Sequence, residues 1–186
     1  MRTAIFVSFA FVLSACAAPG TRPADMSVAG HQRAAQASQP PIAVQHRQAG
    51  EQLQAREDRA CAGLTLEERA PGFFGSATVI GVEPLYNDDL APYLVGAEIE
   101  LRADRGANRP WLERVIACHL AEAASAGHDL EAVPECPFAP KGVKADLRQV
   151  PGGYVISVRT KDLDAAKEVW RRAQHLAVRS RHARTF

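Results

Sequence analysis

Residues 94–103 carry the clearest strand pattern in the chain, because apolar residues from Val95 to Leu101 alternate with glycine or charged residues. The apolar positions are Val95, Ala97, Ile99 and Leu101. A period of two is typical of a β-strand with one buried and one solvated face. The rest of the chain must therefore supply a layer that covers one side of a sheet.

Three further strands and two long helices are predicted around this strand. The strands are expected at residues 76–83, 143–147 and 154–158, and the helices at residues 108–126 and 163–178. The element order is thus ββαββα. It predicts an α+β domain over residues 73–180, with a four-stranded, mainly antiparallel sheet and both helices on one face.

The residues before this domain are more polar. Residues 42–72 predict a mostly solvated helical segment whose thin apolar face includes Ala49 and Leu53. Residues 16–41 contain four prolines and no sustained hydrophobic period, which predicts a flexible tether. Residues 181–186 form a basic tail that could contact lipid phosphates or anionic envelope polymers, or simply fray in solvent.

The N-terminus has the organisation of an export signal. Arg2 is followed by an apolar run over residues 4–13, which is too short to span a bilayer and typical of a signal peptide over residues 1–15. The next residues, Leu13-Ser14-Ala15-Cys16, resemble the lipobox of bacterial lipoproteins.

That resemblance implies cleavage before Cys16 and acylation of its thiol, which would anchor the chain to a membrane. Ala17 after the cysteine resembles an outer-membrane sorting signal, so the expected location is the cell envelope, on the periplasmic side of the outer membrane in a Gram-negative host. An ordinary secretory signal is the alternative, because Ala15-Cys16-Ala17 also fits a small-x-small cleavage site.

Three cysteines remain beyond Cys16. An exported domain meets an oxidising compartment, so one disulfide and one leftover thiol are expected. Cys118–Cys136 is the favoured pair, because it would close the loop after the middle helix; pairings through Cys61 stay open. If Cys61 is the free thiol, Arg56 and Arg59 could activate it for redox chemistry.

A metal centre is the alternative use of these residues. The candidate ligands are Cys118, Glu122, His128 and Cys136. The first two are one helical turn apart, and thiolate with imidazole suits zinc or copper. His119, on the apolar face of the same helix, is interpreted instead as a core histidine that bonds a backbone carbonyl.

Composition and motifs narrow the function. The formal net charge is +1, and removal of Arg2 with the signal peptide leaves zero, so nucleic acid is not expected as a partner. The hydrolase, nucleotide-binding and haem motifs that would indicate an enzyme are missing from the sequence, and no cofactor is expected. The sequence favours a non-catalytic lipoprotein that binds or scaffolds an envelope protein or polymer. The alternative is a metal- or redox-handling domain built on Cys118, His128 and Cys136.

Overall fold

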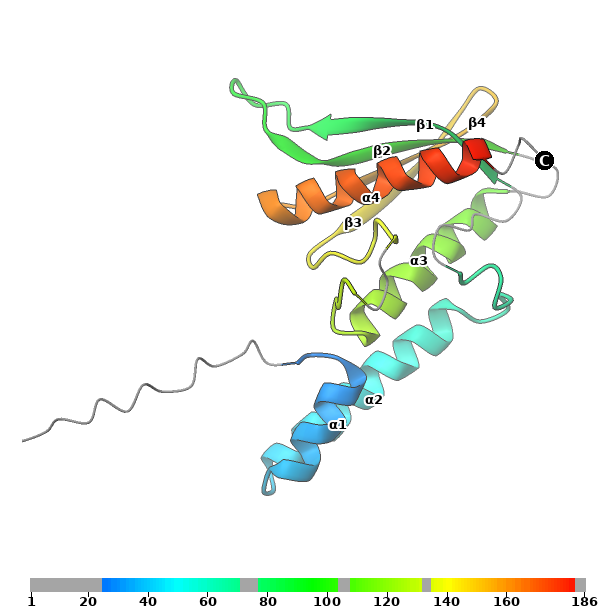
Figure 1. Cartoon of the computed structure of the whole chain (residues 1–186). Coiled ribbons are helices and arrows are strands. Elements are labelled where there is room, and N and C mark those ends of the chain that lie inside the picture. The colour runs from blue at the N-terminus through cyan, green and yellow to red at the C-terminus, as the bar shows by residue number, and fades with distance from the viewer. Residues whose placement is uncertain (1–24, 71–76, 104–107, 132–134, 183–186) are drawn as a thin grey trace, which may run out of the picture.

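The computed structural model describes residues 25–70, 77–103, 108–131 and 135–182 (Figure 1). The helices in this part are α1 (Val28–Ala37), α2 (Ile42–Ala60), α3 (Arg109–Ser125) and α4 (Leu163–His182). The strands are β1 (Ala77–Tyr86), β2 (Leu94–Ala103), β3 (Lys144–Val150) and β4 (Gly153–Arg159). None of the described helices is both long and apolar enough to cross a membrane.

The four strands form one antiparallel sheet in the order β1-β2-β4-β3. This confirms the predicted α+β fold and its ββαββα order. The central strands β2 and β4 pair Ile99 with Ile156 and Ala97 with Val158, and all four side chains are buried. The alternation read from the sequence therefore places the apolar residues of both strands on the same face.

Helices α3 and α4 cover that face, as predicted (Figure 1). The helix α4 packs against β1 and β2, whereas α3 approaches β3. The opposite face is polar: Ser157 Oγ donates a hydrogen bond to Glu98 Oε1 at 2.9 Å. The N-terminus of α3 is capped by Asn108, whose Oδ1 accepts from the Trp111 amide at 3.0 Å.

The loop before β3 fills the core rather than lying on the surface. Phe138 is 1% exposed and belongs to the same apolar cluster as the sheet and both helices. Arg172 of α4, itself 2% exposed, donates to the carbonyls of Leu130 at 2.9 Å and Cys136 at 3.4 Å. It also donates to Glu168 Oε1 within α4 at 2.6 Å, so one buried guanidinium attaches two points of this loop to α4.

A flexible tether was predicted over residues 16–41, and this is wrong in its second half, where the helix α1 forms. This helix packs antiparallel to α2, so the two make a helical hairpin (Figure 1). Ser27 caps α1 by accepting from the Gly30 amide. The two helices lie close together at Gly50, where a Cβ would be in ordinary van der Waals contact with His31 Cβ at 3.4 Å. The sequence of α1 has little apolar periodicity, so its stability comes from this docking.

The polar helix predicted before the sheet domain is α2, which buries only Ala43 and Gly50 among its residues. A capping box follows α2, since Thr65 and Glu68 exchange hydrogen bonds between side chain and backbone at 2.8 and 3.2 Å. At the other end of the chain, α4 continues to His182, so the predicted basic tail begins within this helix. The lipobox and Cys16 lie outside the described residues.

Candidate ligand-binding cleft

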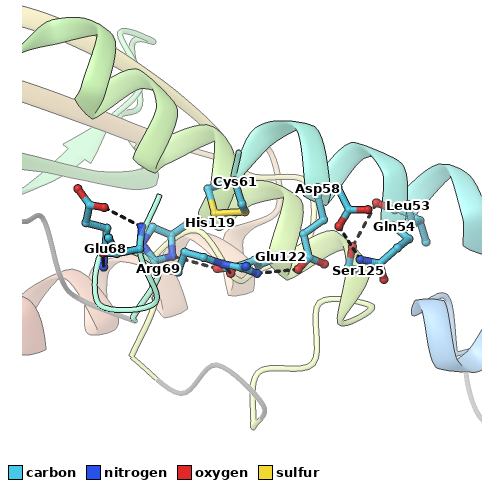
Figure 2. Close-up of a disulfide and its surroundings, with 12 residues drawn as sticks. Leu53, Gln54, Asp58, Cys61, Glu68, Arg69, His119, Glu122 and Ser125 are labelled. Atoms are coloured by element: carbon cyan, nitrogen blue, oxygen red, sulfur yellow. Dashed lines mark hydrogen bonds and ion pairs between the residues drawn. A yellow bond between two sulfur atoms is a disulfide. The ribbon is translucent and has the colours of Figure 1, made fainter. Parts of the chain in front are cut away.

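A disulfide joins the helical hairpin to the sheet domain. Cys61, directly after α2, is bonded to Cys118 in the middle of α3 (Figure 2). The favoured Cys118–Cys136 pairing is therefore wrong. Cys136 is the free cysteine among the described residues, and the fold turns it into the core beside Phe138 while the hairpin brings Cys61 to α3.

An ionic bridge reinforces the same junction (Figure 2). The Arg69 guanidinium contacts Glu57 of α2 at 2.9 Å and Glu122 of α3 at 2.8 Å. Burial raises the pKa of Glu122, and the hydrogen bond and charge of Arg69 lower it again in part. The disulfide and this bridge together set the position of α2 relative to α3.

His119 lies beside the disulfide and is buried, as predicted, with only 4% of the residue exposed. Its ring stacks near Phe138, and its Nδ1 atom lies 3.6 Å from Glu122 Oε2. The structure thus gives it a carboxylate neighbour where a backbone carbonyl was predicted. Burial, with a smaller contribution from the charge of Arg69, lowers the pKa of His119 to about 4.

This burial predicts a pH-dependent stability. An unfolded His119 binds a proton below pH 6.5, whereas the folded protein resists protonation until about pH 4, so stability falls as pH decreases between these values. The free energy of unfolding should drop by about 2 kcal/mol from pH 8 to pH 5 through this residue alone. Urea unfolding of the wild type and His119→Gln at both pH values measures it. If the free energy of unfolding changed equally with pH in both proteins, His119 would not be the source of the pH dependence.

The four predicted metal ligands are not brought together. Cys118 forms the disulfide with Cys61, and His128 Nδ1 forms a hydrogen bond with the Ala139 carbonyl at 3.0 Å. Burial raises the pKa of Cys136 to about 11, which disfavours the thiolate that a metal requires. The described residues hold one grouping of three ligand-type atoms, Cys61, Cys118 and Glu122, and its two sulfur atoms are bonded to each other.

A cleft of about 600 Å³ lies where the helical hairpin meets the end of α3 and the loop before β3. This volume suits a small ligand. Its α2 wall consists of residues spaced as one helical face: Ala49, Gln52, Leu53 and Arg56. The disulfide and the Arg69 bridge hold this face against α3, so the cleft depends on the junction described above.

Basic side chains from four segments line the cleft. They are His31 of α1, Arg56 of α2, His128 after α3 and Lys141 before β3. Within the part of the chain that the structure describes, no ion pair or side-chain hydrogen bond engages Arg56 or Lys141, and no acidic residue lines the cleft. The cleft therefore presents cations whose charge the protein does not neutralise locally.

The two histidines are oriented by hydrogen bonds. A carbonyl only accepts, so His128 Nδ1 carries the proton shared with Ala139, and Nε2 is left for a ligand. The Nδ1 atoms of His31 and His46 lie 3.1 Å apart, so one ring donates and the other accepts. These hydrogen bonds restrict the orientation of the His31 and His128 rings in the absence of a ligand.

A second hollow, of about 820 Å³, lies over the open face of the sheet near the β1–β2 turn. Its lining mixes acidic and basic side chains, and Lys141 borders it as well as the first cleft. Arg159 pairs with Asp146 at 3.1 Å, and Glu98 accepts from Ser157, whereas no acidic residue lines the first cleft. The cleft with its unmatched cations is therefore the stronger candidate site.

No family model, curated protein or solved structure matches the chain. Function must therefore be argued from the site alone.

Sequence reasoning missed most of this site. Lys141, His31 and Arg56 were not singled out as ligand-binding residues, although the spacing of 49, 52, 53 and 56 along one helical face was visible. His128 was placed in a site, but with metal ligands that the fold keeps apart from it. What links these residues is the docking of the hairpin, which no local pattern encodes.

Proposed function

We propose that this protein is an exported, lipid-anchored component of the cell envelope whose folded part is a non-catalytic binding module. The observation that carries the binding role is the cleft, in which uncompensated cations and apolar side chains from separate segments converge. Such a combination of an apolar surface with a few convergent polar groups is typical of small-molecule sites.

Two features support export and anchoring. The first is the lipobox-like Leu13-Ser14-Ala15-Cys16 after a short apolar run. The second is the Cys61–Cys118 disulfide, since disulfides persist in oxidising compartments and are rare in the cytosol. The first comes from the N-terminal sequence and the second from the folded domain, so each supports export independently.

The intact mass of the protein extracted from membranes tests this proposal. We expect a chain that begins at Cys16 and carries acyl groups. Alkylation under denaturing conditions should block one thiol before reduction, Cys136, and three after it. Cys16→Ser, the matched variant, should move the protein out of the membrane fraction.

Other masses would overturn parts of the proposal separately. An unacylated chain that begins after Ala17 would mean a secreted protein without an anchor. Three thiols alkylated before reduction would mean that the disulfide is missing in the cell, which would contradict export to an oxidising compartment.

A further inference from the structure

We infer that the cleft binds an anionic amphiphile: a molecule with one alkyl chain and a phosphate or carboxylate head group. This inference deepens the proposed function and relies on it for the position of the cleft near a membrane. It rests on three properties of the cleft: its charge, its apolar wall and its place in the chain.

The charge favours an anionic head group. Arg56 and Lys141 come from elements far apart in sequence, yet both face the same cleft and have no ion pair in the described part of the protein. A guanidinium forms paired hydrogen bonds with phosphate or carboxylate, and an ammonium adds a second positive charge.

The apolar wall favours an alkyl chain on the same ligand. Met26, Leu53 and Ala124 line the cleft together with the cations, and Met26 is 53% exposed although it is a large apolar residue. Burying such side chains against a hydrocarbon chain contributes about 25 cal/mol per Å². An inorganic anion without an alkyl chain would leave the apolar wall of the cleft exposed to water.

The position along the chain would place the cleft near lipid. Met26 lies ten residues after Cys16, and a fully extended chain of this length spans at most about 36 Å. If Cys16 carries lipid, the cleft is confined to this distance from its point of attachment. Amphiphiles that leave or enter the bilayer are therefore within reach.

The test measures ligand binding calorimetrically on the chain from Cys16 onward with Cys16→Ser, which carries no acyl group. The probes are octyl phosphate below its micelle concentration, octyl glucoside with the same chain and no charge, and inorganic phosphate with no chain. We expect octyl phosphate to bind at least ten-fold more tightly than either of the others. The same binding measurement with vesicles containing phosphatidylglycerol distinguishes a bilayer lipid from a free monomer as the source of the ligand.

Matched variants locate the site. Arg56→Gln and Lys141→Gln should each weaken octyl phosphate binding about ten-fold, the effect of losing one charge-assisted hydrogen bond. Arg59→Gln is the control: it removes the same charge from the exposed surface of α2, one turn from Arg56 and outside the cleft. Binding lost in the two cleft variants and kept in the control supports the inference.

Three results would overturn it: equal affinity for inorganic phosphate and octyl phosphate, equal affinity for the neutral glucoside, or equal losses in all three variants. The last would indicate general surface charge. Because the tested chain lacks the lipid, these outcomes are independent of the mass measurement, so failure of the anchor and failure of the ligand assignment are distinguishable.

Discussion

Replacing both Cys61 and Cys118 with alanine is expected to lower the free energy of unfolding by about 4 kcal/mol. The disulfide spans 57 residues of sequence, and chain-entropy reasoning gives this magnitude for a loop of that length. For a chain of this size, the melting temperature should fall by about 10 °C. Urea unfolding and thermal denaturation measure the change.

The matched control is Cys136→Ala, which removes the buried thiol that forms no disulfide. It should cost about 1 kcal/mol, the value of a small loss of buried volume. The double variant should also weaken any ligand of the cleft, because the disulfide holds the α2 wall against α3. Equal stability losses in the control and the double variant would show that the cross-link is not formed.

Arg172→Ala is expected to destabilise the protein by about 3 kcal/mol. The substitution leaves the carbonyls of Leu130 and Cys136 without their donor, and removes a fully buried side chain from α4. The Cys136 hydrogen bond is buried, so its unsatisfied carbonyl costs about 1–3 kcal/mol, and the lost packing adds to this. The Leu130 carbonyl belongs to an exposed residue and can bond water instead. Chemical denaturation measures the total, and hydrogen exchange should show faster opening near residues 136–139.

Two variants separate charge from geometry at this position. Arg172→Lys keeps the positive charge but not the planar fork, so it should recover only part of the loss. Arg171→Ala removes the exposed partner of the same carboxylate, Glu168, and should cost under about 1 kcal/mol. If the alanine variants at 171 and 172 were equally stable, the buried hydrogen bonds would contribute nothing.

Glu168 links these two arginines electrostatically. Hydrogen bonds from Arg171 and Arg172 lower its pKa to about 2. The stabilisation this carboxylate provides is therefore present above its ordinary pKa of 4.5 and is lost as pH falls towards 2. This acid window lies below that of His119, so the two contributions are separable in a pH titration of stability.

The secondary structure of the sheet domain followed from the sequence because its patterns are local. The alternation at Ala97, Ile99 and Leu101 defined both the strand and the face it buries. The helix α3 begins next to the predicted start, after its Asn108 cap, and the capping box of Thr65 with Glu68 is an equally local signal. Each of these signals needs only neighbouring residues, so no knowledge of the tertiary structure was required.

Tertiary structure alone decided the junction and the cleft. The helix α1 was not predicted from the sequence, and it is ordered by its packing against α2. Disulfide connectivity followed the docking of that hairpin rather than sequence separation, which is why Cys61 and not Cys136 reached Cys118. Long-range packing likewise brought Arg56 and Lys141 to one cleft. The sequence by itself determined the elements and their buried faces, since those depend on local periodicity. Which segments meet depended on how those faces packed, and this is a property of the whole chain.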